Sequence, residues 1–205
     1  GAKYAIFVCK HHDGFENWPS KYTDYSVANT PWKNGKGDVV DEFVKACRKY
    51  DMKVGLYYSP AQVGASSHNT EKIDGEAYCT YFINQISELL TNYGKIDYLW
   101  FDGCGSEGID YDKNRIVDAI RSMQPEILIF NMWDPDTRWV GNESGYTPLP
   151  NYNYVDKLNF SILTSKLEDV TTDGEKLFLP AECDFKMRDN AWFHSKYNEH
   201  TRKTL

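Results

Sequence analysis

The stretch Tyr98-Leu99-Trp100-Phe101-Asp102-Gly103 places a single carboxylate at the end of a short apolar run. A segment with helical spacing of apolar residues, Tyr78 to Tyr93, precedes this run, and Gly94 separates the two. Because glycines also follow it, the run is typical of a buried strand that stops abruptly. Catalytic groups of α/β enzymes lie at the carboxyl ends of parallel strands, and we therefore expect Asp102 to be a catalytic nucleophile.

Segments of strand length alternate with helical segments along the whole chain. Further apolar runs typical of strands lie at residues 4–9, 53–58, 127–130 and 177–179. Apolar residues recur with helical spacing at residues 39–50, 78–93 and 116–123, and more weakly at 155–167. Asp38 is placed to cap the first helix, Gly94 to end the second and Pro125 to end the third. This alternation predicts an α/β fold with a parallel sheet and right-handed crossovers.

Two architectures share this pattern, namely an open doubly wound sheet and a (β/α)8 TIM barrel. Residues 103–108 spell G-x-G-x-x-G, but Asp102 and Glu107 would place negative charge where a nucleotide phosphate binds, so we reject a nucleotide loop. The 205 residues hold about five β/α units, against about 250 residues for a full barrel. We expect one domain over residues 1–205, an incomplete barrel that lacks strands at both ends.

Composition limits the classes of partner. The net charge of −7 argues against nucleic acid, because phosphate binding requires clustered Lys and Arg, and we expect no membrane partner. The five cysteines form no C-x-x-C pair, and we expect Cys9, Cys47 and Cys79 to be buried free thiols. The chain begins at Gly1 and is almost at once inside an apolar run. We expect an N-terminal part to be missing, so the compartment and the oligomeric state stay open.

A histidine pair follows the first apolar run, in His11-His12-Asp13. These side chains could bind metal, but consecutive strand residues point to opposite faces, and only His68, His194 and His200 could complete the coordination. We therefore expect no metal, and favour hydrogen bonding to substrate hydroxyls, because neutral imidazole both donates and accepts. A hydrogen-bonded core histidine is the other possibility.

A second carboxylate would complete a glycosidase site, since retaining enzymes pair a nucleophile with a general acid about 5 Å away. The first candidate is Glu143, in a loop with aromatic neighbours that would exclude water and raise its pKa. Glu182, after the last apolar run, is the second candidate, and Glu107 is the third.

The tryptophans in segments that follow the strands could form a platform for the apolar face of a sugar. They are Trp18, Trp133, Trp139 and Trp192. Core packing explains most tryptophans in proteins and is the competing interpretation. We expect Trp18 and Trp192 to contact substrate.

Long segments of the chain resemble the catalytic barrel of the α-L-fucosidases of glycoside hydrolase family 29. They are KHHDGFENWPSKYTDYSV, GKGDVVDEFVKACRKYDMKVGLYYSP, DYLWFDG, RWVGNESGY and LPAECDF, in the order of the family. The resemblance implies that the chain carries barrel strands two to six and that Asp102 is the nucleophile. It also implies that His11, His12 and Tyr57 bind fucose.

The RWVGNE and PAECD segments resemble the branch of this family that acts on α-1,3/1,4-linked fucose, in which a glutamate of the RWVGNE loop is the acid/base, here Glu143. The resemblance further implies a fucosylated oligosaccharide or glycoconjugate as substrate, no cofactor, and a secreted, periplasmic or lysosomal location. Two alternatives remain from the residues themselves. One is a carbohydrate-binding or inactive barrel fragment, and the other is a metal-dependent barrel hydrolase.

Overall fold

The computed structural model describes residues 1–61, 75–106, 109–141, 143, 145–147, 149, 151–156, 176–184 and 186. Two compact units are present, residues 1–135 and residues 136–205, and each is described by itself. The first unit contains β1 (Tyr4–Lys10), η1 (Val27–Asn29), η2 (Trp32–Gly35), α1 (Val39–Lys49), β2 (Lys53–Tyr58), α2 (Gly75–Asn92), β3 (Tyr98–Phe101), α3 (Lys113–Met123) and β4 (Leu128–Phe130). The prediction of a single domain stays a prediction.

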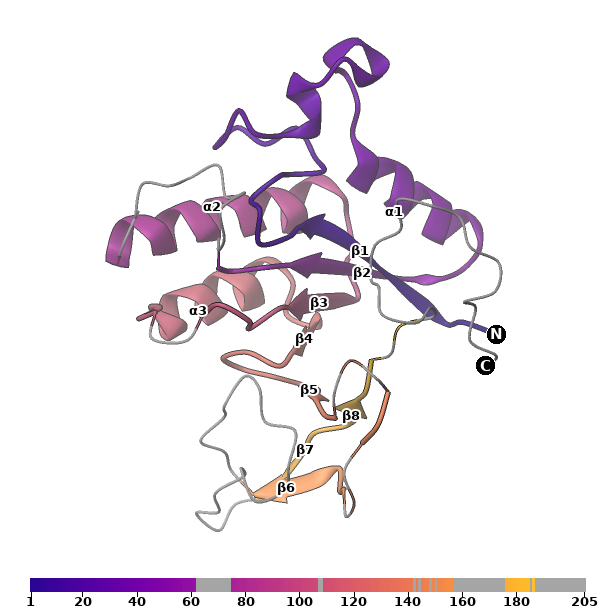
Figure 1. Ribbon diagram of the computed structural model, residues 1–205, viewed down its shortest axis with the longest axis vertical. Helices are drawn as coiled ribbons and strands as arrows, with labels where there is room; N and C mark the ends of the chain where they lie inside the picture. The colour runs from indigo at the N-terminus through magenta and orange to yellow at the C-terminus, as the bar shows by residue number, and fades with distance from the viewer. Residues whose placement is uncertain are drawn as a thin grey trace. The chain divides into compact units, whose positions relative to one another are not determined.

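The four strands of the first unit form one sheet in the order β1-β2-β3-β4, and every pair is parallel. Figure 1 shows β1, β2 and β3 side by side, with their arrowheads at the same edge. These strands coincide with the runs predicted at residues 4–9, 53–58, 98–101 and 127–130 to within about one residue at each end. The predicted α/β fold with a parallel sheet is therefore confirmed.

The helix signals in the sequence act as predicted. Asp38 caps α1 by accepting a hydrogen bond from the Asp41 N–H at 2.9 Å. Gly94 follows α2 with φ of +71°, a backbone conformation that favours glycine. Asp112 caps α3 in the same way as Asp38, by accepting from the Arg115 N–H at 3.1 Å. The two N-caps mark where the chain enters α1 and α3, and Gly94 marks where it leaves α2.

One face of the sheet packs against the helices. Phe7 of β1 stacks on Phe43 of α1, with ring centroids 5.3 Å apart. Phe101 of β3 packs on Phe82 of α2 with ring centroids 5.9 Å apart, and both side chains are fully buried.

Three of the cysteines, Cys9, Cys47 and Cys79, are buried and free, as predicted.

Strand alternation turns the intervening residues to the opposite face of the sheet. There an aromatic ladder, defined as Tyr57, Trp100 and Phe130, crosses β2, β3 and β4. The ring centroids lie 5.2 Å apart between the first two residues and 4.1 Å apart between the last two, with interplanar angles of 17° and 10°. Stacked rings on neighbouring strands hold those strands in one register.

The second unit departs from the sequence prediction. It contains β5 (Arg138–Trp139), β6 (Tyr154–Asp156), β7 (Lys176–Phe178) and β8 (Ala181–Glu182). The apolar run at 177–179 is not a fifth strand of the parallel sheet, because β7 pairs antiparallel with β6. The helix predicted from Val155 is wrong at its start, since Tyr154 pairs across the strands with Phe178 at 5.4 Å between ring centroids. The rest of that prediction, at 157–167, lies outside the described residues.

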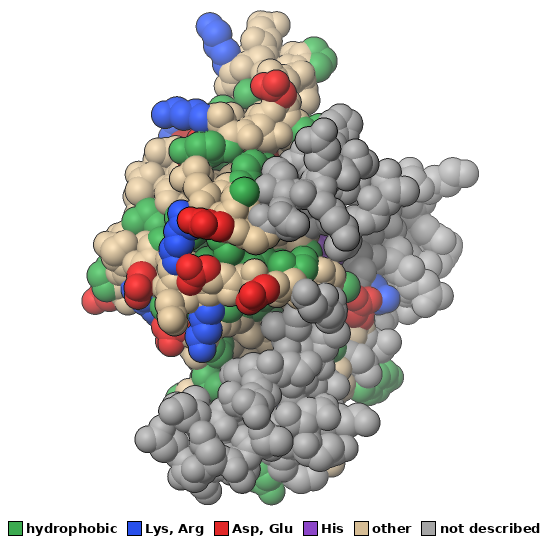
Figure 2. All heavy atoms as spheres, turned by 90° about the vertical axis from the view of Figure 1, so that its left-hand side faces the viewer, with side chains coloured by type: hydrophobic (Ala, Val, Ile, Leu, Met, Phe, Trp, Pro, Cys, Tyr) green, Lys and Arg blue, Asp and Glu red, His purple; other side chains and the backbone are tan. Residues whose placement is uncertain are grey.

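On the face shown in Figure 2, the acidic and basic side chains of the described residues lie interspersed among apolar ones. Within the described ranges no helix has both the length and the apolar character needed to cross a bilayer.

A buried network of polar side chains connects the end of β1 and the segment that follows it to β2 and α2. Lys10 and Glu16 are both fully buried. The Lys10 ammonium donates to the Tyr58 hydroxyl at 3.0 Å, and that hydroxyl donates to the Gln85 side-chain carbonyl, whose amide donates to Glu16. Burial lowers the pKa of Lys10 to about 7 and raises the pKa of Glu16 to about 8, against the opposing influence of each charge on the other.

We predict that Glu16 makes folding stability depend on pH. Between its ordinary pKa of 4.5 and its folded pKa of about 8, Glu16 binds a proton in the folded protein that it does not bind in the unfolded chain. Stability should therefore fall as pH rises through this window, by at most about 1.4 kcal/mol per pH unit. Lys10 acts in the opposite sense above about pH 7, because there the unfolded chain holds the extra proton.

Urea unfolding of the wild type and of Glu16→Gln at pH 5, 6 and 7 measures this effect. The stability of the variant relative to the wild type should rise with pH, because glutamine does not titrate and still accepts from Gln85. Glu126→Gln is the matched control, since the Glu126 side chain is 85% exposed and its effect should be independent of pH. A constant difference for Glu16→Gln would show that this carboxyl titrates normally in the folded protein.

Candidate active site

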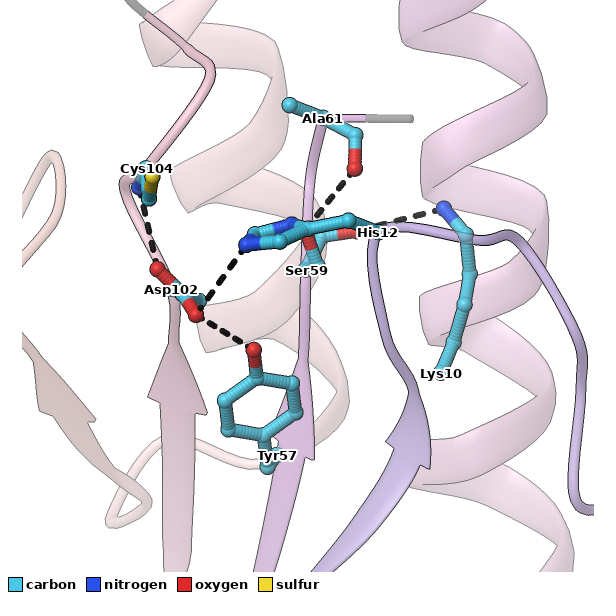
Figure 3. A network of polar contacts seen from close by, with 7 residues as sticks. All are labelled: Lys10, His12, Tyr57, Ser59, Ala61, Asp102 and Cys104. Atoms are coloured by element: carbon cyan, nitrogen blue, oxygen red, sulfur yellow. Dashed lines mark hydrogen bonds and ion pairs between the residues drawn. The ribbon is translucent and has the colours of Figure 1, made fainter. Parts of the chain in front are cut away.

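Asp102 lies directly after β3, and three groups face its carboxylate (Figure 3). The Tyr57 hydroxyl donates to Oδ2 at 2.5 Å, and the backbone N–H of Cys104 donates to Oδ1 at 3.0 Å. The imidazole Nε2 of His12 lies 3.5 Å from Oδ2. The Asp102 side chain is 23% exposed, so the carboxylate is held by its neighbours but still open to a small molecule.

The register of β2 and β3 brings Tyr57 to Asp102. Tyr57 pairs with Trp100, so its ring stands on the same face of the sheet, and its hydroxyl reaches along the strand direction to the residue that follows β3. Burial raises the pKa of Tyr57, and the charge of Asp102 raises it further. The hydroxyl therefore keeps its proton and acts as a hydrogen-bond donor to the carboxylate.

The two histidines lie on one side of the chain, contrary to the argument from strand alternation. That argument is wrong here because β1 ends at Lys10, and His11 and His12 lie in a turn closed by a hydrogen bond from the Gly14 N–H to the His11 carbonyl at 3.0 Å. The turn brings the two imidazole centroids within 4.3 Å of each other. Both rings are therefore available to one ligand.

His11 lies parallel to Tyr57, with ring centroids 5.7 Å apart and an interplanar angle of 2°. Burial lowers the pKa of His11, and the neighbouring His12 lowers it further, while Asp102 and Asp13 oppose the shift. The neutral ring is thereby favoured, and a neutral ring has one donor and one acceptor nitrogen, as predicted for a residue that binds hydroxyl groups.

The same cluster could chemically bind a metal ion. His11, His12 and Asp102 each offer a ligand atom, and these atoms lie within 4.8 Å of one another. Imidazole nitrogen and carboxylate oxygen are ligands for zinc and related ions. The expected absence of a metal therefore stays a prediction that needs a direct test.

Trp18 corrects the predicted sugar platform. Its side chain is fully buried, and its indole N–H donates to the Glu88 carboxylate of α2 at 2.9 Å. The other oxygen of Glu88 accepts from the Lys21 backbone N–H at 2.9 Å. Trp18 is thus a core residue that fastens the segment after the histidine turn to a helix, and it cannot present a ring face to substrate.

The other three tryptophans of the predicted platform have different surroundings from Trp18. Trp133 packs in the helix layer against Phe82, Phe101 and Tyr111. Trp139 is half-buried and donates its indole N–H to Asp184 at 2.7 Å. Trp192 lies outside the described residues, as do His68, His194, His200 and Glu107.

The candidate acids belong to the second unit. The Glu143 side chain is 62% exposed and lies 3.8 Å from the Lys186 ammonium, so the expected surroundings of aromatic side chains that exclude water are wrong. Glu182 is half-buried in β8, where it pairs with Trp139 of β5. Which of the two is the acid stays a prediction.

Two residues near Asp102 were missed from the sequence. Trp100 precedes Asp102 by two positions, so strand alternation alone was sufficient to place it on the same face as Asp102. Ser59 follows β2 directly, and its hydroxyl lies 2.5 Å from the His12 Nδ1. Its position after a strand was the available signal.

Comparison with known proteins identifies one family. The family model described as alpha-L-fucosidase matches residues 1–197. Alpha-L-fucosidase 1 of Arabidopsis thaliana is 34% identical over 203 residues, which cover 95% of this chain and 39% of the relative. The chain thus spans about two fifths of the length of these curated relatives.

Solved structures give the same result. A glycoside hydrolase family 29 member from an unknown rumen bacterium has a TM-score of 0.78 and 37% identity, covering 97% of this chain and 38% of its own. A mutant family 29 fucosidase from Ruminococcus gnavus, solved in complex with fucose, has a TM-score of 0.73 and 25% identity, covering 98% of this chain and 46% of its own.

Proposed function

The chain belongs to the alpha-L-fucosidase family, and on this premise we propose that the protein is a retaining exo-glycosidase that releases terminal α-L-fucose from glycans. The observation that carries the proposal is the Asp102 carboxylate at the carboxyl end of a parallel strand, held by Tyr57 and Cys104 and faced by His12. A fucosylated oligosaccharide or glycoconjugate is the proposed substrate.

We propose further that the sheet is part of a (β/α)8 barrel. The four parallel strands of the first unit, with Asp102, Ser59 and the histidine turn all beyond their carboxyl ends, support this architecture. Barrel enzymes build their active sites at that end.

In the proposed mechanism, Asp102 attacks the anomeric carbon while the glycosidic oxygen leaves as a protonated alcohol, which gives a covalent fucosyl-enzyme. Tyr57 and the Cys104 N–H orient the carboxylate, so that one conformer faces the sugar. Water then attacks the same carbon, and the acid of the first step acts as base in the second.

For the acid/base we propose Glu143, because the RWVGNE segment that contains it resembles the branch acting on α-1,3/1,4-linked fucose. In the structure its carboxylate lies 3.8 Å from the Lys186 ammonium. Glu182 is the alternative.

A metal-dependent hydrolase is the second candidate function, favoured by the cluster of His11, His12 and Asp102. Chelation separates the two candidates. Hydrolysis of an aryl α-L-fucoside should be unchanged after dialysis against EDTA if Asp102 is a nucleophile, and should be lost if the cluster holds an essential ion.

We predict that Asp102→Ala in the intact protein lowers turnover of an aryl α-L-fucoside at least about a thousandfold, because the covalent step loses its nucleophile. Azide should restore turnover and give the inverted fucosyl azide, detected by NMR, since the small anion enters the space left by the carboxylate. Asp118→Ala on the exposed face of α3 is the control and should retain full activity. Near-normal turnover by Asp102→Ala would refute the assignment.

We predict that Glu143→Gln lowers kcat/KM most for substrates whose leaving group needs protonation in order to depart. A fucosyl disaccharide needs protonation and should lose about 10²–10⁴-fold in kcat/KM, while a dinitrophenyl fucoside needs none and should lose far less in its first step. Glu182→Gln, measured beside it, should affect both substrates alike. The reverse pattern would transfer the acid role to Glu182.

A further inference from the structure

Ser59 connects the histidine turn to the carboxyl end of β2 through its hydroxyl group. The residue is fully buried, and its Oγ donates to the backbone carbonyl of Ala61 at 2.8 Å. The same oxygen lies 2.5 Å from the Nδ1 of His12 (Figure 3). The serine hydroxyl therefore has two partners of different chemical character.

Counting protons decides the tautomer of His12. A hydroxyl carries one proton, and a carbonyl oxygen can only accept, so the Ser59 proton points to Ala61. The oxygen then presents a lone pair to His12, and a hydrogen bond at 2.5 Å requires that Nδ1 carry a proton. The reverse arrangement would leave the Ala61 carbonyl 2.8 Å from a hydroxyl lone pair, which is repulsive.

The backbone of Ser59 is itself fixed. Its N–H donates to the Lys10 carbonyl at 2.9 Å, and its carbonyl accepts from the buried Lys10 ammonium at 3.2 Å. The strand residue just before the histidine turn thus holds the serine from both sides. His12 is consequently oriented by β1 and β2 together.

We infer that Ser59 is a positioning residue that holds neutral His12 as the Nδ1–H tautomer, so that the bare Nε2 accepts a hydrogen bond from a hydroxyl of the sugar. In this tautomer the His12 Nε2 and the Asp102 Oδ2, which lie 3.5 Å apart, are both acceptors. Neither can donate to the other, so a hydrogen bond to Nε2 needs a donor on the ligand. The tautomer follows from the geometry alone, whereas the identity of the donor rests on the proposed function.

The recognition that follows is directional. As the Nδ1–H tautomer, His12 would accept a hydrogen bond at Nε2. It would therefore favour a ligand group that donates, as a hydroxyl does, over one that only accepts. In the other tautomer, His12 would donate from Nε2 to Asp102 and would offer the ligand nothing further on that nitrogen.

Long-range ¹H–¹⁵N correlation spectra of the ¹⁵N-labelled protein test the tautomer without any turnover. Near pH 8, where imidazole is mostly neutral, His12 should show a protonated Nδ1 and a bare Nε2. His12→Gln assigns the signals by their loss. A protonated Nε2 in the neutral wild-type ring would overturn the inference.

Variants then test the role of Ser59 itself. Ser59→Ala should move His12 toward the Nε2–H form, and Ser59→Thr, which retains a hydroxyl, should restore the wild-type pattern. Ser87→Ala is the matched control, because its hydroxyl also bonds a backbone carbonyl, at Ile83, but is part of α2 and not of this network. An unchanged Nδ1–H signal in Ser59→Ala would refute the role.

Binding of fucose and its deoxyfluoro analogues tests the consequence. Fluorine does not donate, so in the wild type the analogue that replaces the hydroxyl facing His12 should bind about tenfold more weakly than fucose, and this penalty should shrink in Ser59→Ala. Equal binding of all analogues by the wild type would refute acceptance at Nε2. Failure to bind fucose at all would contradict the proposed function, while the spectra would still decide the tautomer.

Discussion

The site depends on β2 and β3 pairing in one register. A shift of one residue would turn Tyr57 from the face of the aromatic ladder to the helix face, because side chains alternate along a strand, and Asp102 would lose its hydroxyl donor. The aromatic ladder of Tyr57, Trp100 and Phe130 makes such a shift costly, since stacked rings on three neighbouring strands would all be displaced together. The same packing that stabilises the sheet therefore orients the carboxylate.

The histidine turn is held less by apolar packing than by hydrogen bonds from buried groups. Lys10 bonds the carbonyl of Ser59, Glu16 is bonded by Gln85 of α2, and Trp18 is bonded by Glu88 one turn further along that helix. Burying these polar groups is costly, and each bond offsets part of the cost while it fixes one more point of the segment. A segment fixed at several points loses little conformational entropy when a ligand binds.

Sequence reasoning succeeded where many residues repeat one signal. The strands β1 to β4 were predicted because each lies in an apolar run of at least four residues, and the helices between them because apolar residues recur with helical spacing, with caps such as Asp38 at their ends. It missed β5, β6 and β8, which have only two or three residues each, and it missed the antiparallel pairing of β7. That pairing depends on partners such as Tyr154 and Phe178, which are more than twenty residues apart in the sequence. Trp18 was misassigned for a related reason, since nothing in its own segment shows that Glu88 lies beside it.

The candidate site shows the same division between residue identity and environment. Residue type and position after a strand were enough to select Asp102 and the histidine pair as candidates, and Tyr57 was selected from the family resemblance. The hydrogen-bonding partners of each group could not be predicted in this way, because they depend on which donors and acceptors from distant segments meet in space. Asp102 collects a hydroxyl, a backbone N–H and an imidazole from three separate segments, and His12 receives its tautomer from a serine 47 residues away. A carboxylate proposed as a nucleophile must be both aimed and accessible, and its aim here depends on segments that meet at the strand ends, which no single stretch of sequence contains.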